Sequence, residues 1–475
     1  MPPARTRLSS LVLLSMLLSP VLPTRLPAQL PPCRDLQDLT RIGQSFAQAF
    51  PLTGGLVLSV EQRGVAVYQQ AFGGFALGEV VPIASATKTL SAAVLLALVD
   101  DGLVALDDRV GQYLPEWNSG LRATITLRHC FTHTSGLIAS HPAISDDTIT
   151  LRQAAQQLAT TPLQFTPGSA FAYGGVSMHV AGAVCEVASG RSWAQLFQQE
   201  VAQPLGMNAT DYLAFGPTLN PRIAGGARSN AADFGALVAM LNAEGLWQGR
   251  RVLSAAAVQE LLRDQTSGLP VVSTPHLQGA PYGIGVWLDR RDAMGRTRLA
   301  SAGGAFGFIA WVDRDHRSSG TWVVLNRYQQ VDPYVQQVWT ALDGALLPDQ
   351  VTCFGSGSPA CAAGTWVQAS APPRAGMDDF ALLVRRAPPA AFGGIALGLP
   401  LAAPQPVLDL SAHLALPVLA FAPLVTDATG SALLPVSLRS VSAGLQLGVQ
   451  AVFLPALPCS SSGLVASHGL LLAVH

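Results

Sequence analysis

The chain has 475 residues, of which 49% are hydrophobic and 12% are charged, so it can bury large cores and should divide into two or three domains. This composition excludes an intrinsically disordered chain. A net charge of -1 and the lack of a basic run exclude the electrostatic signature of nucleic-acid or membrane-surface binding, so neither partner is expected.

The N-terminus has the pattern of an export signal. Two arginines precede an apolar stretch from Leu11 to Leu22, and Ala28 follows at the distance of a cleavage site. We expect residues 1–28 to be a signal peptide and the mature protein to be secreted or periplasmic. A membrane anchor is the poorer interpretation, because the stretch is too short to span a bilayer and contains Pro20. Prolines rather than small residues precede Cys33, which disfavours lipid attachment.

Six cysteines in an exported chain permit disulfide bonds. Cys353 and Cys361 flank a loop rich in Gly, Ser and Pro and form the expected bridge. Cys130 and Cys185 lie in stretches typical of packed helices, where they are either bridged or free buried thiols. The first and the last cysteine have no assigned partner.

Residues 33–350 mix strand and helix patterns. Two alternating stretches, Gly55–Val60 and Val65–Ala71, flank a Gln-Arg-Gly turn and predict a hairpin. Thr89–Val99 has the pattern of an apolar helix, and the Asp-Asp-Gly that follows predicts its end. These residues are therefore predicted to form an α/β domain.

The composition changes near residue 350. Residues 351–376, rich in Gly, Ser, Pro and Ala, read as a linker, and 377–475 read as a small all-β module of short runs separated by Pro and Gly. Prolines interrupt the apolar runs of this module well before 18 residues, which excludes a membrane helix there. The module either binds a surface or polymer or is a stabilising appendage.

Lys88 is the only lysine; the other 27 of the 28 cationic side chains are arginines. It follows Ser85 by three residues, which on a helix places the hydroxyl and the amine one turn apart on the same face. An amine, unlike a guanidinium, becomes a proton acceptor when burial lowers its pKa. Ser-x-x-Lys therefore indicates an activated nucleophile, although a solvated helix start gives the same pattern.

Four further motifs follow Ser-x-x-Lys in the chain. They are Leu127–Leu137, with Thr-His-Thr-Ser-Gly-Leu; Pro167–Tyr173; Pro204–Met207; and Tyr282–Gly285, with Tyr-Gly-Ile-Gly. In this order they resemble the serine β-lactamase and penicillin-binding-protein superfamily over residues 35–348, most closely the branch of class C β-lactamases, esterases and D-aminopeptidases. The resemblance implies a mixed, mostly antiparallel sheet with the N- and C-terminal helices on one face and an inserted all-helical lobe.

The resemblance also implies a covalent acyl-enzyme on Ser85. Lys88 and Tyr173, the latter able to form a phenolate, would serve as bases in acylation and in the activation of water. The backbone N–H groups of Ser85 and Gly304 would bind the oxyanion.

Two positions depart from the motifs of the superfamily. Ser301-Ala302-Gly303 stands where Lys-Thr-Gly or His-x-Gly is usual, and Ser301 either replaces the missing cation as a hydroxyl donor or belongs only to the strand. Gly175 stands where the lactamases carry asparagine. Groups for a substrate carboxylate and acylamide are thus missing, which favours a secreted serine esterase or amidase for neutral acyl substrates.

Two alternatives remain. One is a β-lactamase or D,D-peptidase of the same mechanism, with substrates that include cell-wall-derived ones; the other is a non-catalytic binding protein that keeps the fold. No cofactor and no metal are expected. His129 and His133 have the spacing of helical zinc ligands, but no Glu lies between them and no third ligand is evident, so structural histidines are expected. A chain ending near Leu347 should fold and hydrolyse esters.

Overall fold

The computed structural model describes residues 36–275, 281–348, 351–354, 365–407, 410–415, 418–454 and 464–474. Two compact units divide the chain: 34–351 with 369–374, and a second unit made mainly of 375–475. The expected signal peptide and three cysteines lie outside the described residues, as does the side chain of Cys353, so the expected bridge is not described. Cys130 and Cys185 are buried and free.

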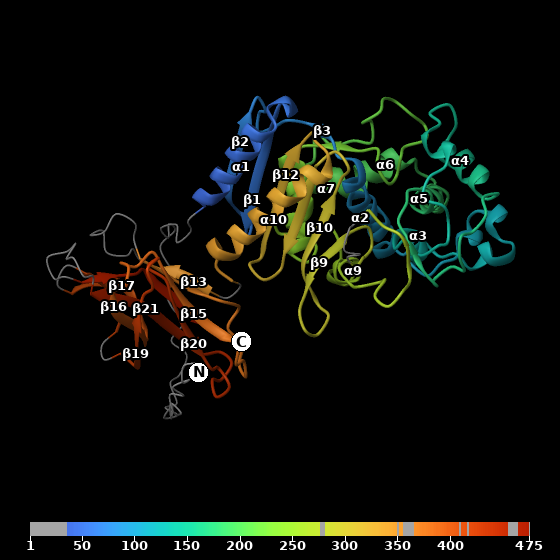
Figure 1. Ribbon diagram of the computed structural model, residues 1–475. Helices are drawn as coiled ribbons and strands as arrows, with labels where there is room; N and C mark the ends of the chain where they lie inside the picture. Colours follow the sequence, from blue (N-terminus) through green and yellow to red (C-terminus); the bar gives the residue numbers. More distant parts are fainter. Residues whose placement is uncertain are drawn as a thin grey trace, which may run out of the picture. The chain divides into compact units, whose positions relative to one another are not determined.

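A six-stranded sheet forms the centre of the N-terminal unit (Figure 1). Its strand order is β2-β1-β12-β11-β10-β9, and each strand pairs antiparallel with its neighbours. The bounds are β1 Gly55–Gln62, β2 Val65–Gly73, β9 Trp287–Arg291, β10 Thr297–Gly303, β11 Ile309–Asp313 and β12 Ser318–Val324. The predicted hairpin is confirmed, because β1 and β2 pair around Arg63-Gly64.

Helices α1 (Gln37–Ala49) and α10 (Tyr328–Ala345), from the two ends of the unit, cover one face of this sheet. Their apolar side chains pack with strand residues such as Leu299 and Trp322. Side chains alternate between the faces of a strand, so the residues beside Leu299 point to the opposite face. This arrangement confirms the expected covering of one face by the terminal helices.

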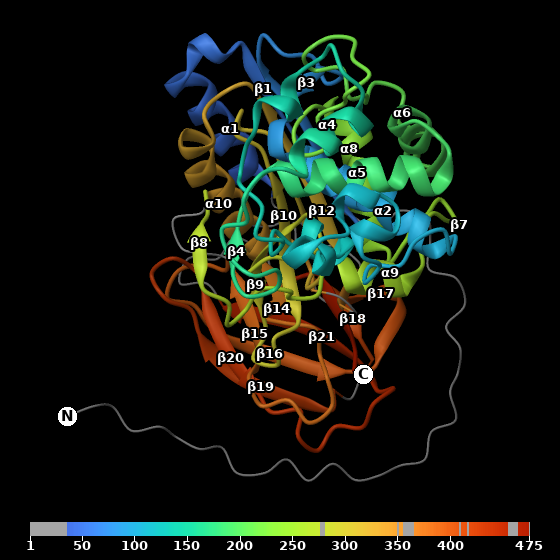
Figure 2. The ribbon, with the colours of Figure 1, turned by 90° about the vertical axis from the view of Figure 1, so that its right-hand side faces the viewer.

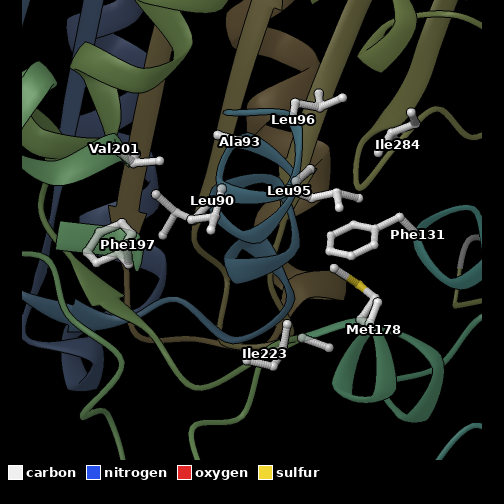
Figure 3. Packing of buried hydrophobic residues seen from close by; sticks show 14 of the residues in the cluster. Leu90, Ala93, Leu95, Leu96, Phe131, Met178, Phe197, Val201, Ile223 and Ile284 are labelled. Carbon is white, nitrogen blue, oxygen red and sulfur yellow. The ribbon is translucent and has the colours of Figure 1, made fainter. Parts of the chain in front are cut away.

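Helix α2 (Thr87–Asp100) covers the other face and carries Lys88. It is apolar on all sides, and residues 87–98 are all buried, as expected for a helix enclosed by other elements. Figure 3 shows its leucines among Phe131, Met178 and Phe197 of the inserted helical lobe. The nucleophile motif is thereby attached to a helix that its neighbours enclose.

Helix α8 (Ala231–Asn242) packs on the same face of the sheet as α2. Figure 2 shows the other elements of the unit, which are short or lie in the inserted lobe. The helices are α3 Leu127–Phe131, α4 Leu151–Leu158, α5 Val176–Ser189, α6 Trp193–Phe197, α7 Gln203–Leu205 and α9 Ala255–Leu261. The short strands pair as β3 Val81–Pro82 with β5 Arg228–Ser229, β4 Phe171–Ala172 with β8 Val271–Ser273, and β6 Leu246–Trp247 with β7 Arg250–Arg251. Among the described residues, no helix is long and apolar enough to cross a membrane.

The C-terminal unit consists of strands, which confirms the expected all-β module. One sheet has the order β13-β23-β21-β16-β19, with β22 paired to β21; a second is β14-β15-β20, and β17 pairs with β18. The bounds are β13 Val351–Phe354, β14 Trp366–Ala369, β15 Phe380–Arg385, β16 Phe392–Gly398, β17 Pro400–Val407, β18 Leu410–Leu414, β19 Ala420–Val425, β20 Ala432–Val436, β21 Gln446–Leu454, β22 Val465–Ala466 and β23 Gly469–Ala473. Strands β13 and β14 lie within 351–376, so part of the predicted linker belongs to the sheets instead.

Candidate active site

Ser85 lies in a single 3-10 turn, Ala84–Ala86, directly before α2. Its side chain is half-buried, whereas Lys88, one turn into the helix, is buried. Lys88 Nζ donates to Ser85 Oγ at 3.0 Å and to the carbonyl oxygen of Ala224 at 2.8 Å. The structure thus brings the predicted nucleophile and base into hydrogen-bond contact.

The electrostatics of Lys88 fit a proton acceptor. Burial of the amine lowers its pKa from 10.5 to about 7, because the charged form loses its solvation. A neutral amine is therefore available near neutral pH. The solvated helix start, the alternative interpretation of Ser-x-x-Lys, does not fit a buried lysine.

Tyr173 follows β4 and completes the cluster. Its hydroxyl is hydrogen-bonded to Ser85, and Lys88 Nζ lies 4.6 Å from the centroid of its ring. The ring stacks on Trp287 with a centroid distance of 5.2 Å and packs against His133 at 4.5 Å. Burial of the hydroxyl raises the pKa of Tyr173, so the expected phenolate role needs correction: at neutral pH the side chain is a phenol that can donate and relay a proton.

Strand β10 turns alternate residues to the two faces of the sheet. Ala300 and Ala302 pack in the cluster around α2, whereas Leu299 packs on the side of α1 and α10. Gly303 lies against the ring of Tyr328 on that second side, and alternation places Ser301 there too. The hydroxyl of Ser301 is hydrogen-bonded to Asp289, whose pKa burial raises to about 7.

Ser301 is directly opposite Trp287 on the neighbouring strand, so the two side chains share a face, and the ring of Trp287 stacks on Tyr173. The replacement of the missing cation by the hydroxyl of Ser301 therefore stays a prediction.

The turn after β10 also corrects the expected oxyanion donor. The N–H of Gly304 donates to the carbonyl oxygen of Phe308 at 2.8 Å, and Gly307, with φ +88°, donates to Gly304. This is a three-residue hairpin loop closed by a bulge glycine. The N–H of Gly304 is thus already used in a hydrogen bond, whereas the N–H of the next residue, Ala305, has no partner within the described part of the chain.

Gly304 serves the site by its lack of a side chain. A Cβ at this position would lie 2.1 Å from the carbonyl oxygen of Ile83, so only glycine lets the strand approach the turn that holds Ser85. Ala84, with φ +43°, is the non-glycine residue in the left-handed region within that turn. The hairpin and the nucleophile turn therefore fix each other's position.

His129 and His133 do not form a metal site. His129 caps the start of α3 by accepting the N–H of Thr126 on Nδ1 at 3.3 Å, while His133 packs among aromatic rings. The carboxylates and imidazole of Asp313, His316 and Asp343 lie within 4.8 Å of one another, a cluster that the motifs did not indicate. His316 already pairs with Asp313 at 2.6 Å and Arg290 with Asp343 at 2.7 Å, as in a structural ion-pair group.

Comparisons with known proteins agree with this geometry. The Beta-lactamase family model matches residues 45–341. Esterase EstB of Burkholderia gladioli is 34% identical over 190 residues, which cover 34% of this chain and 48% of the esterase. The D-alanyl-D-alanine-carboxypeptidase/endopeptidase AmpH of Escherichia coli K12 is 34% identical over 147 residues, 29% of this chain and 37% of that protein.

Among solved structures, a candidate beta-lactamase from Bacteroides dorei has a TM-score of 0.60 and 27% identity. The match covers 65% of this chain and 98% of the other. The sequence matches to the two curated relatives thus span less than half of their lengths, whereas the structural match spans nearly all of its partner. The predicted family and fold are confirmed.

Proposed function

The chain belongs to the beta-lactamase family, and we propose that it is a serine hydrolase that cleaves esters or amides through an acyl-enzyme on Ser85. The observation that carries this proposal is the contact between the buried amine of Lys88 and Ser85 Oγ at 3.0 Å. A binding protein that only kept the fold would have no use for a buried lysine with a pKa near 7, because burial of an amine costs stability.

In acylation, neutral Lys88 takes the proton of Ser85 as Oγ attacks the substrate carbonyl carbon. The N–H groups of Ser85 and Ala305 stabilise the resulting oxyanion. The proton then passes from Lys88, through the hydroxyl of Tyr173, to the departing alcohol or amine as the carbon–heteroatom bond breaks. In deacylation a water molecule gives its proton to the same pair, attacks the ester carbon and releases the acid, and Oγ recovers its proton.

Two side chains that would favour β-lactams or D,D-peptides are missing. Ser301 stands where a cation for a carboxylate is usual on β10, and Gly175 stands where an asparagine amide is usual. A substrate that the β10 side of the site recognises by shape alone therefore fits better than a β-lactam or a D,D-peptide. Simple esters are substrates of this kind, and one relative is named an esterase. The second candidate is a D,D-peptidase, since another relative is named a D-alanyl-D-alanine-carboxypeptidase.

We further propose that the protein is exported, a proposal supported by the residues of the N-terminal 28-residue stretch alone. The mature chain would then meet its substrate outside the cytoplasm.

The test is to treat the purified protein with a fluorophosphonate and to map the adduct by mass spectrometry. We expect one label, on Ser85, and none in Ser85→Ala. Turnover of p-nitrophenyl butyrate and of nitrocefin, measured side by side, separates the enzymatic candidates. We expect the ester to be hydrolysed and nitrocefin to be hydrolysed slowly or not at all. An unlabelled Ser85 would identify a binding protein, and efficient nitrocefin turnover would refute the argument from Ser301 and Gly175.

A further inference from the structure

A cavity of about 230 Å³ lies beside the base, on the side of the site formed by the helical lobe. Lys88 forms part of its wall, and its other walls include Ile144, Phe215 and the backbone of Gly225. A volume of this size holds roughly seven groups of the size of a water molecule, at about 30 Å³ each. Ser85 itself does not line the cavity, but Lys88, whose Nζ contacts Ser85 Oγ at 3.0 Å, does, so the cavity lies next to the position of an acyl group on Ser85 and is large enough for a short acyl chain.

The cavity is open because Gly175 has no side chain. A Cβ added there would lie 3.3 Å from Ile144 Cδ1 and 3.6 Å from Ala224 Cβ, so any larger side chain would extend into this space. The φ of Gly175 is -100°, a value that any residue adopts. The glycine is thus not required by the backbone, and its effect is the space that it leaves.

Arg222 supplies a cation to this cavity. Its guanidinium Cζ lies 4.2 Å from the centre of the Phe215 ring, which holds the group in one orientation. Its Nε is buried and has no hydrogen-bond partner within the described residues. Its Nη2 forms an ion pair with Asp147 Oδ2 at 3.6 Å, a distance too long for a hydrogen bond.

Besides Lys88 and Arg222, the lining contains one more titratable group, His179, which is neutral at physiological pH. Burial lowers its pKa to about 4, and its Nε2 is hydrogen-bonded to Asn220 at 2.7 Å. A guanidinium with unused donors in a half-enclosed apolar cavity is the arrangement that binds carboxylates.

We propose that this cavity binds the acyl chain and that Arg222 binds a carboxylate at the end of that chain, so that the substrates are half-esters or half-amides of short dicarboxylic acids. The inference rests on the proposed acyl-enzyme at Ser85. We assign the anionic group to the acyl part of the substrate, because the acyl group stays in the site as the acyl-enzyme while the leaving group must diffuse out. This assignment also revises the expected neutral acyl substrate, which was inferred from Ser301 and Gly175 without Arg222.

The experiment compares monoethyl glutarate with its neutral isostere, the ethyl ester of glutaric acid monoamide, in a pH-stat assay. The parent should have the higher kcat/KM for the charged ester. Arg222→Met should lower the ratio of charged to neutral kcat/KM by about 10- to 100-fold, the effect of one charge-assisted contact, and leave turnover of ethyl acetate within about threefold. Arg222→Lys should restore part of the ratio.

Two further variants keep the result decisive. Arg228→Met removes an arginine outside the cavity that pairs with Asp211 at 2.9 Å, and its ratio should equal that of the parent. Gly175→Leu places a side chain in the cavity against Ile144 and Ala224, and it should slow both glutaryl esters. An acetate ester of 4-hydroxybutyrate carries its carboxylate on the leaving group and should show no dependence on Arg222.

Several outcomes would overturn the inference and leave the proposed function intact. They are a parent without preference for the charged ester, an unchanged ratio in Arg222→Met, and a dependence on Arg222 that appears only with the leaving-group carboxylate. Failure of the parent to hydrolyse ethyl acetate, together with an unlabelled Ser85, would overturn both.

Discussion

Lys88 Nζ lies 3.0 Å from Ser85 Oγ, inside a shell of apolar side chains that lowers the amine's pKa to about 7. Only the neutral amine accepts a proton, so kcat/KM for an ester should rise with pH through about 7 and then level off. Lys88→Met should remove this limb and lower kcat by about 10² to 10⁴, the usual range for a general base. A pH–rate profile of p-nitrophenyl butyrate turnover checks both effects; a profile that is flat from pH 5 to 9 would exclude Lys88 as the base.

Lys88→Arg keeps a cation but removes the base, because arginine stays protonated in proteins. We expect a similar loss of kcat. The buried position has little room for the larger guanidinium, so a loss of about 1–3 kcal/mol of stability should accompany it. Circular dichroism at the assay temperature shows whether the variant is folded, and parental turnover in a folded variant would assign proton transfer to Tyr173.

Tyr173→Phe tests the proton relay. Burial raises the pKa of the Tyr173 hydroxyl, so this group should act as a donor rather than as a phenolate. The variant should have a lower kcat, while its pH–rate profile keeps the limb near pH 7 that Lys88 sets. The ring should still stack on Trp287, which predicts a melting temperature close to that of the parent. Loss of the limb near pH 7 would show instead that Tyr173 is the group that titrates.

Gly304→Ala should damage both stability and activity. The added Cβ would lie 2.1 Å from the carbonyl oxygen of Ile83, a backbone atom that cannot move without displacing Ser85. We expect a loss of about 2 kcal/mol or more in urea unfolding and a strongly lowered kcat, as overpacking and strain predict. The matched control is Gly235→Ala in α8, where nothing lies within 4 Å of the new Cβ; it should be neutral or raise stability by up to about 1 kcal/mol.

Spacing explains why the sequence located Ser85 and Lys88 but not the free backbone N–H group after β10. The two residues of Ser-x-x-Lys are one turn apart on any helix, so their contact follows from spacing alone. In contrast, Ser-Ala-Gly-Gly has no apolar alternation to mark its register. The pairing with β11 and the hairpin bonds of Gly304 and Gly307 determine which N–H groups are used, and both depend on residues outside the motif.

The cavity beside Lys88 was beyond sequence reasoning for a different reason. Its walls come from four segments, around residues 88, 144, 175 and 222, which no local pattern relates to one another. The sequence shows that Gly175 replaces an asparagine, but the space left by the missing side chain depends on the positions of Ile144 and Ala224. Arg222 is one of 27 arginines and nothing in its neighbouring sequence distinguishes it.

Lys88 should also make the stability of the fold depend on pH. Its pKa is about 7 in the folded protein against 10.5 for an ordinary lysine, so between these values the unfolded chain binds the proton more tightly. Stability from this group is therefore fully present above about pH 10.5, declines as the pH falls, and is lost by about pH 7. Each pKa unit corresponds to about 1.4 kcal/mol. Lys88→Met should be more stable than the parent at pH 7, with a difference in urea midpoints that narrows by pH 9; a constant difference would contradict the lowered pKa.

The boundary of the N-terminal unit gives the last prediction, and it corrects the truncation point expected from the sequence. Gln62 Nε2 donates to the carbonyl oxygen of Leu347 at 2.8 Å, and Arg63 donates to those of Pro348 and Val351 at 2.7 and 3.0 Å. A chain ending at Val351 keeps all three contacts, whereas one ending at Leu347 loses the two from Arg63.

We expect residues 34–351 to fold and to hydrolyse esters. The shorter chain should be less stable by about 1–3 kcal/mol, the sum of two hydrogen bonds. Thermal unfolding of the two truncated chains, with p-nitrophenyl butyrate turnover measured on each, checks this order. If the chain ending at Val351 is folded by circular dichroism but inert, then residues beyond 351 complete the active site, and the N-terminal unit is not the whole enzyme.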